Sequence, residues 1–332
     1  ERNKMGKKRI LSGNRPTGKL HLGNYVGALE NWVRLQNEYE CFYMVADWHA
    51  LTSDYADTSA MRGNIDSMVL DWLAAGLDPD ICVMFIQSKV KQHAELSLLL
   101  SMFVPLPWVE RCPTYKEALA QIQDKDLRTH GFLGYPILQA ADILIYKADA
   151  VPVGEDQLPH LELTREIARR VNFIYGKIFT EPQDILSRVP KLLGTDGRKM
   201  SKSYGNCIYL SDDEKTVNEK ASLMVTDPAR VRRSDKGHPE VCSVFDYHKV
   251  FTRERAAEIE QGCRDAALGC VECKKILMAS LKTLLEPMRI RREELLKKPD
   301  TVRFVIEDGN RRASEAAEKT MIEVREALRL VP

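Results

Sequence analysis

The stretch that decides the fold is KRILSGNRPTGKLHLGN, residues 8–24. Its apolar beginning, residues 8–12, is followed by turn residues that include Gly13 and Gly18, which predicts a strand and then a loop. From about residue 24 to residue 35, apolar side chains recur at helical spacing. The stretch therefore predicts a strand, a glycine-containing loop and a helix, in that order.

The same alternation continues along the first half of the chain. Residues 41–46 and 81–86 are apolar runs, as in strands that are buried on both faces. Between them lies a helical pattern that Ser59 can cap and that Gly76 ends, just before Pro79. Strands that alternate with helices predict a doubly wound parallel sheet with helices on both faces.

The second half of the chain has a different pattern. From about residue 211 onward it is mostly helical and charged, without clear strands. Near the end, four apolar residues share one helical face: Ala317, Met321, Val324 and Leu328. We therefore expect an α/β domain followed by an all-helical domain, whose last helix can pack back on the first domain.

Length and charge set limits on the kind of protein. The 332 residues leave room for two domains, and the 49 basic residues are balanced by 48 acidic ones. Without a global positive field, a polyanion would have to be held by local basic patches. No apolar run approaches the roughly 18–20 residues that span a bilayer, and the basic N-terminus lacks the apolar stretch of a secretory signal. We expect a cytoplasmic protein.

The loop between the first strand and its helix, residues 16–24, has the composition of a phosphate site. Glycines allow a phosphate to approach the backbone, and the N-terminus of a helix favours negative charge. His21 and Asn24 would offer hydrogen-bond donors to a transferring phosphate. The alternative is an ordinary strand–helix turn with a surface histidine.

A second loop, GRKMSKS at residues 197–203, carries two lysines in a stretch of glycine and serine. Lys199 and Lys202 could clamp a pyrophosphate group while its charge develops in the transition state. A mobile loop would also suit a site that must close and reopen. The alternative is a solvated basic loop.

Four of the eight cysteines form the pattern C-x20-C-x6-C-x2-C: Cys242, Cys263, Cys270 and Cys273. Four thiolates can hold zinc or a [4Fe–4S] cluster, although structural zinc sites usually have two close pairs of ligands and this pattern has one. The others, Cys41, Cys82, Cys112 and Cys207, are scattered, and three of them have the apolar or loop surroundings of small buried thiols. A disulfide scaffold is not expected in a chain this long.

Together, the two loops resemble the HIGH and KMSKS signatures of class I aminoacyl-tRNA synthetases, the first as the variant HLGN. From about residue 9 to residue 330, the chain is most similar to the tryptophanyl-tRNA synthetases. The segments that carry this resemblance are GNRPTG (13–18), ADWHA (46–50), GYPILQAADIL (134–144) and VPVGEDQ (151–157). Tyrosyl enzymes share the fold and the loop pair but resemble the middle segments less well.

A physical reason also supports tryptophan. Indole has one N–H donor and no acceptor, so its selection requires a buried acceptor in an apolar slot. Asp142, between apolar neighbours, fits this need, whereas the alternative is an acid on a helix surface. The resemblance implies that Tyr135 and Gln157 hold the substrate's ammonium and that His49 and Gln139 line the pocket. His49 could equally be a core histidine whose hydrogen bonds are satisfied within the protein. Gln139 stands where many relatives have methionine.

The resemblance also implies the ATP site and the reaction. It gives a catalytic set of His21, Asn24, Lys116, Lys199 and Lys202. It assigns ATP contacts to Arg15, where many bacterial relatives have glutamine, and to Thr17, Gly18, Gly23, Asn24, Gly154, Asp156, Lys199, Met200, Ser201 and Lys202. Tryptophan would attack the α-phosphorus of ATP, with Mg²⁺ on the phosphates, and would then pass to the 3′ end of tRNA(Trp).

Domains and partners follow from the same resemblance. It predicts a Rossmann-like catalytic domain (8–193), a KMSKS loop and linker (194–210), a helical anticodon-binding domain (211–300) and a C-terminal helix (301–332). A subset of relatives has a similar cysteine motif, with a slightly longer first gap, and holds a [4Fe–4S] cluster, so a structural cluster is favoured over zinc or no metal. A homodimer is also implied. Two basic patches are either tRNA contacts or solvated helix faces: Arg230, Arg232, Arg233 and Lys236 in one, and Arg289, Arg291 and Arg292 in the other.

Three rival functions remain to be separated. A tyrosyl-tRNA synthetase would be revealed by the amino acid that drives activation. A small-molecule adenylyltransferase is disfavoured by KMSKS and the long helical tail. A regulatory paralogue that binds RNA or tryptophan would have no need of the full transition-state set, and tRNA charging distinguishes it.

Overall fold

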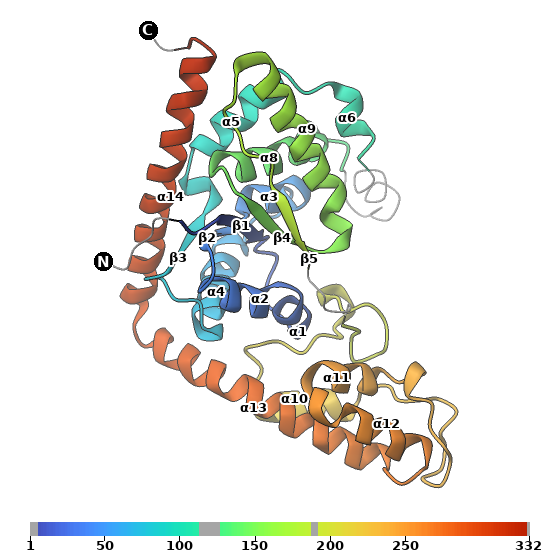
Figure 1. Ribbon diagram of the computed structural model, residues 1–332. Helices are drawn as coiled ribbons and strands as arrows, with labels where there is room; N and C mark the ends of the chain where they lie inside the picture. Colours follow the sequence, from blue (N-terminus) through green and yellow to red (C-terminus); the bar gives the residue numbers. More distant parts are fainter. Residues whose placement is uncertain (1–5, 113–126, 187–191, 331–332) are drawn as a thin grey trace.

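The computed structural model describes residues 6–112, 127–186 and 192–330 (Figure 1). Five parallel strands form one sheet in the order β3-β2-β1-β4-β5. The strands are β1 (Arg9–Asn14), β2 (Glu40–Val45), β3 (Cys82–Ile86), β4 (Ala150–Val153) and β5 (Gln183–Leu186). From β1 the chain winds outward through β2 to β3 and then returns to add β4 on the other side of β1. Ligands bind beyond the carboxyl ends of the strands at such a reversal.

Helices make up most of the remaining described chain. Those of the first part are α1 (Leu22–Asn24), the π-helix η1 (Tyr25–Leu29), α2 (Glu30–Leu35), α3 (Asp47–Asp54), α4 (Met61–Ala75), η2 (Gln87–Lys89), α5 (Gln92–Ser101), α6 (Leu106–Glu110), α8 (His130–Ile145), η3 (Glu155–Gln157) and α9 (Leu158–Tyr175). Those of the second part are η4 (Lys202–Tyr204), α10 (Glu214–Ser222), η5 (Pro239–Val241), α11 (Ser243–Phe251), η6 (Arg253–Arg255), α12 (Ala256–Arg264), α13 (Cys270–Leu296) and α14 (Pro299–Ala327).

Both faces of the sheet are buried. Ile10 belongs to a cluster with residues of α2 and α4, whereas its neighbour Leu11 belongs to a second cluster with residues of α5, α8 and α9. Successive strand residues point to opposite faces, so this division shows that helices cover both. The doubly wound α/β fold and the helical second part are confirmed.

Two expected helix boundaries had different outcomes. Gly76 ends α4 in the left-handed conformation, with φ of +111°, as predicted. The prediction that Ser59 caps this helix is wrong, because α4 begins at Met61 with Ala60 at the cap position and no side-chain cap. Ser59 instead donates its backbone N–H to Asp57 at 2.9 Å, in the turn before the helix.

The long helix α14 covers the edge strand β3 (Figure 1). Its backbone comes so close that a Cβ at Gly309 would collide with the carbonyl oxygen of Met84. The neighbouring Asn310 accepts a hydrogen bond from the backbone N–H of Ile86 at 2.9 Å. A sheet edge with free backbone groups is a site for unwanted pairing, so α14 protects the edge while it buries apolar surface.

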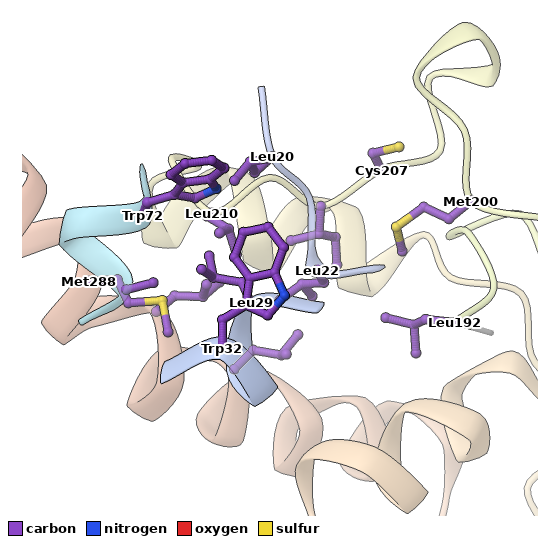
Figure 2. Packing of buried hydrophobic residues seen from close by; sticks show 14 of the residues in the cluster. Leu20, Leu22, Leu29, Trp32, Trp72, Leu192, Met200, Cys207, Leu210 and Met288 are labelled. Atoms are coloured by element: carbon purple, nitrogen blue, oxygen red, sulfur yellow. The ribbon is translucent and has the colours of Figure 1, made fainter. Parts of the chain in front are cut away.

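The helical part shares a core with the sheet. Figure 2 shows Trp32 and Trp72 beside Met288 of α13 within one buried cluster. The two indole rings meet edge to face, with centroids 5.4 Å apart. Arg292 of α13 also pairs with the buried Asp71 of α4 at 2.7 Å. None of the described helices combines the length and apolar character needed to cross a membrane.

Candidate active site

A large cavity of about 2460 Å³, including its open mouth, lies at the carboxyl ends of β1 and β4. It brings together most of the side chains that the sequence singles out: Arg15, Thr17, His21, Asn24, His49, Tyr135, Gln139, Asp142, Gly154, Gln157, Met200, Ser201 and Lys202. Gly18, Gly23, Asp156 and Lys199 lie in the same loops but are not part of its lining. Lys116 lies outside the described residues.

The HLGN loop and the KMSKS loop are in direct contact. Backbone bonds tie their flanks together, from Leu22 N–H to the carbonyl of Ile208 at 2.9 Å and from Leu210 N–H to the carbonyl of Leu20 at 3.0 Å. Gly18 has φ of +116°, and a Cβ there would lie 3.5 Å from the Nζ atom of Lys202. The positive φ therefore favours glycine at this position, whereas a Cβ would make only an ordinary contact with the lysine side chain.

The local geometry fixes the proton of His21. Its Nδ1 accepts the backbone N–H of Asn24 at 3.2 Å, while the Asn24 side chain accepts the backbone N–H of His21 at 3.1 Å. Burial, and then the positive charge of Lys202, lower the pKa of His21 to about 4. The ring is therefore neutral at pH 7, and with Nδ1 as an acceptor the proton resides on Nε2. This leaves one N–H donor for a ligand.

The KMSKS loop is braced by Asn206, which the sequence reading did not single out. Its side chain is buried, accepts the backbone N–H of Ser201 at 2.8 Å, and donates to the carbonyl of Lys199 at 3.1 Å and to Asp196 at 2.7 Å. Burial lowers the pKa of Lys202. Within the described chain, neither Lys199 nor Lys202 forms an ion pair, so their charges remain available to a ligand.

At the other end of the cavity, Asp142 is 1% exposed and accepts bonds from three side chains. His49 Nε2 lies 2.7 Å from Oδ2, His93 Nδ1 lies 2.6 Å from Oδ1, and Gln87 Nε2 donates to both oxygens at 2.8 and 3.0 Å. Burial opposes ionisation, but the bonds from His49 and His93 outweigh it, and the pKa of Asp142 lies below its ordinary value. Asp142 is thus not an acid on a helix surface.

The donors around Asp142 divide into two groups. His49 lines the cavity, whereas Gln87 and His93 are fully buried behind the carboxylate. Tyr146, also buried, lies 2.8 Å from Nε2 of His93 and extends the network. The sequence reading missed these three residues. Gln87 directly follows β3, so the rule that strand ends gather at one edge could have indicated it.

The remaining pocket residues come from α8 and from the segment after β4. The hydroxyl of Tyr135 lies 3.0 Å from Nε2 of His160, a buried residue of α9 that also lines the cavity. Gln157 donates to Asp156 at 3.1 Å. Gly154 is packed against the same aspartate, because a Cβ there would lie 2.8 Å from Oδ1 of Asp156.

Far from this cavity, the four patterned cysteines line one small hollow between α11, α12 and the beginning of α13. Arg230 donates to the Sγ atom of Cys263 at 3.6 Å, and a Cβ at Gly237 would collide with that sulfur. Burial raises the pKa of the Cys273 thiol to about 12. Within the described ranges, no three His, Cys, Asp or Glu side chains have an arrangement that holds a metal ion. The scattered cysteines are buried: Cys41, Cys82, Cys112 and Cys207.

Comparison with known proteins identifies the family. The family described as tRNA synthetases class I (W and Y) matches residues 3–286. A tryptophan–tRNA ligase from Thermotoga maritima is 56% identical over 326 residues, which cover 97% of this chain and 99% of the relative. The chain belongs to the tryptophanyl-tRNA synthetases.

Solved structures agree with this membership. A tryptophanyl-tRNA synthetase from Campylobacter jejuni, complexed with ADP and tryptophan, is 34% identical with a TM-score of 0.85, covering 96% of this chain and 99% of that one. A tyrosyl-tRNA synthetase from Archaeoglobus fulgidus, 22% identical with a TM-score of 0.69 over 86% of this chain and 90% of that one, shares the fold. The synthetase is a tryptophan–tRNA ligase, and its substrates are ATP, tryptophan and tRNA(Trp).

Proposed function

We propose that the synthetase activates tryptophan in the large cavity, with the indole at Asp142 and the phosphates of ATP between the HLGN and KMSKS loops. The observation that carries this proposal is the buried carboxylate at one end of a cavity whose other end holds Arg15 and Lys202, neither of which forms an ion pair within the described residues. A buried acceptor suits a ligand with one N–H, whereas basic groups suit phosphates.

At the tryptophan end, Asp142 accepts the indole N–H, and Tyr135 and Gln157 hold the ammonium. His49 already occupies one oxygen of Asp142 from the cavity side, so the indole N–H shares or takes that place. Gln139 lines the same end. An analogue without the N–H would leave a buried polar group unpaired, which is the physical basis of selection.

At the phosphate end, the proton on Nε2 makes His21 a donor to a phosphate oxygen. Asn24 holds this ring, and Lys199 and Lys202 stabilise the charge that grows on the pyrophosphate. The adenosine ribose meets Gly154 and Asp156. The loop residues Arg15, Thr17, Gly18, Gly23, Met200 and Ser201 complete the ATP contacts, and Lys116 is proposed to reach the phosphates. Mg²⁺ would be held mainly by the phosphates of ATP and would shield their charge.

The reaction then has two steps. The tryptophan carboxylate oxygen attacks the α-phosphorus, a P–O bond to the β-phosphate breaks, and pyrophosphate leaves. A ribose hydroxyl at the tRNA 3′ end next attacks the activated carbonyl and releases AMP. The protein needs no covalent intermediate, because positioning and charge stabilisation lower the barrier.

The experiment that tests the site is amino-acid-dependent ATP–pyrophosphate exchange without tRNA. We expect wild-type exchange with tryptophan alone. Exchange that is retained in both the Asp142→Ala and the Lys202→Ala variants would show that activation does not take place in this cavity.

For the cysteine hollow, we propose a structural [4Fe–4S] cluster held by Cys242, Cys263, Cys270 and Cys273. All four side chains border one space, which supports the ligand set. Structural zinc sites usually have two close pairs of ligands, whereas only Cys270 and Cys273 form such a pair here, so the pattern favours the cluster.

Metal content decides between the two. Protein made with iron and without air should be brown, with broad absorbance near ~400 nm, and the Cys270→Ala variant should lose the colour. The Cys207→Ala variant is the matched control, because Cys207 is buried outside the hollow. Colourless protein with stoichiometric zinc would reverse the assignment.

The remaining assignments concern assembly and tRNA. We propose the domain boundaries given above, with residues 211–300 reading the anticodon, and a cytoplasmic homodimer. The loop patch Arg230, Arg232, Arg233 and Lys236 is the proposed phosphate contact. Arg291 and Arg292 are not, because they contact the carbonyl of Ala74 at 2.6 Å and Asp71 at 2.7 Å.

A further inference from the structure

A chain of polar groups leads from Tyr135 away from the cavity. The tyrosine Oη lies 3.0 Å from Nε2 of His160, and Nδ1 of His160 lies 3.3 Å from Sγ of Cys112. His160 is 1% exposed, and its ring meets that of Tyr135 edge to face at 5.3 Å. The hydroxyl of Thr164 donates to the carbonyl of His160 at 2.9 Å, one turn along α9. The imidazole ring is therefore contacted at both of its nitrogens, by Cys112 and Tyr135.

We propose that His160 is a positioning residue for the ammonium site, because it sets the direction of the O–H bond of Tyr135. The inference rests on the proposed role of Tyr135. A tyrosine hydroxyl can donate as well as accept, but an ammonium group only donates. Tyr135 holds an ammonium well only if its proton points elsewhere, and Nε2 of His160 is an acceptor at hydrogen-bond distance from the hydroxyl.

The tautomer of His160 decides between two arrangements. Burial, and then the neighbouring His49, lower the pKa of His160 to about 4, so the ring is neutral at pH 7 and only one nitrogen carries a proton. With the proton on Nδ1, facing Cys112, Nε2 accepts from Tyr135 and the tyrosine oxygen turns its lone pairs toward the cavity. With the proton on Nε2, His160 donates to the oxygen of Tyr135. The tyrosine O–H then points toward the cavity, where it is repelled by the N–H groups of the substrate's ammonium.

Bound tryptophan should therefore select the tautomer with the proton on Nδ1. Ligands that carry the ammonium should depend on His160, whereas ligands without it should not. Tryptamine has the indole and the ammonium, and indole-3-propionate has the indole and the carboxylate. The two ligands distinguish a positioning role for His160 from a general loss of pocket shape, because a loss of shape would weaken the binding of both.

The experiment measures inhibition of ATP–pyrophosphate exchange by tryptamine and indole-3-propionate. In the His160→Phe variant, we expect about tenfold weaker tryptamine binding and a higher KM for tryptophan, with indole-3-propionate binding and kcat within about twofold of wild type. His160→Gln, whose side-chain oxygen can accept from Tyr135, should restore most tryptamine binding. Equal weakening of both inhibitors, or no rescue by glutamine, would overturn the proposal.

Two further measurements keep the test decisive. Tyr135→Phe should also weaken tryptamine binding selectively. If it does not, the assignment of Tyr135 to the ammonium fails, whereas a loss in Tyr135→Phe without a loss in His160→Phe contradicts the inference alone. The ¹⁵N shifts of His160 in the wild-type tryptophan complex should place the proton on Nδ1, even if the phenylalanine variant fails to fold, and a proton on Nε2 would contradict the proposal.

Discussion

The two ends of the active-site cavity are organised in opposite ways. At the proposed tryptophan end, the buried Asp142 already accepts hydrogen bonds from His49, Gln87 and His93, which stabilise its ionised form before a ligand arrives. At the phosphate end, Lys202 is buried enough to lower its pKa but forms no ion pair in the described chain. On the proposed assignment, one end presents a carboxylate that is already hydrogen-bonded, and the other keeps a positive charge without an ion-pair partner in the described chain for the chemistry.

The largest effect should come from breaking the tryptophan end. Asp142→Ala removes the indole acceptor and leaves three buried donors unpaired, so we expect tryptophan-dependent exchange to fall by at least about 100-fold. Asp142→Asn keeps the shape and one acceptor and is the matched control, with a smaller loss. Unchanged discrimination against phenylalanine in the alanine variant would remove Asp142 from the specificity role.

Breaking the phosphate end should reduce kcat and spare amino-acid binding. Lys202→Ala removes a charge from the site of the leaving pyrophosphate, and we expect kcat for exchange to fall about 100-fold while the Kd for tryptophan changes less than about threefold. Lys215→Ala, on an exposed face of α10, is the control and should resemble wild type. A rise in the Kd for tryptophan as large as the fall in kcat would show that the two ends of the cavity do not act separately.

A smaller effect should follow from the contact between the loops. Gly18→Ala places a Cβ at a backbone φ of +116°, so we expect a stability loss of about 1–2 kcal/mol and a several-fold higher KM for ATP. Gly63→Ala is the control, because Gly63 lies within α4 at a position where a Cβ would meet no neighbouring atom. This substitution should be neutral or stabilising, since alanine favours a helix. An unchanged KM for ATP would show that the approach of Lys202 to Gly18 is not needed for binding. Urea unfolding and initial rates measure both quantities.

The smallest expected effect is on the pH dependence of stability, and it tests whether a buried histidine at each end of the cavity is neutral in the folded protein. Burial lowers the pKa of His21 at the phosphate end and of His160 at the tryptophan end to about 4, against 6.5 in the unfolded chain. The unfolded chain therefore binds more protons between these values, so the free energy of unfolding should decrease as the pH falls from 6.5 toward 4. The His21→Asn variant and the His160→Gln variant should each take up nearly one proton fewer than the wild type when they unfold at pH 5. No change in uptake would contradict burial of that ring as a neutral group.

The sequence predicts what depends on local patterns. Strand and helix alternation gave the parallel sheet, and the glycine at position 76 gave the end of α4 because a left-handed residue favours glycine. The cap at Ser59 was wrong, since the turn before α4 is closed by Asp57 and the helix starts later than the pattern indicates. The spacing of apolar residues does not show which of two nearby polar side chains, Asp57 or Ser59, will bond to the backbone before the helix.

The rest of the site depends on tertiary contacts. Asp142 could be singled out because its neighbours are apolar, but its donors Gln87 and His93 come from a segment about 50 residues away in sequence and look like ordinary helix-start residues. Arg292, one of a basic run, is directed into the sheet domain to pair with Asp71 rather than toward solvent. The fold, and not the spacing, decides which charges face a ligand.

The central claim is that one hydrogen bond at the tryptophan end selects the amino acid. The most direct measurement compares exchange driven by tryptophan with exchange driven by the analogue in which sulfur replaces the indole N–H, which has nearly the same shape. We expect kcat/KM for the analogue to fall by at least about 100-fold in the wild type, and most of this gap to close in Asp142→Ala. An analogue that is activated as well as tryptophan by the wild type would contradict the account.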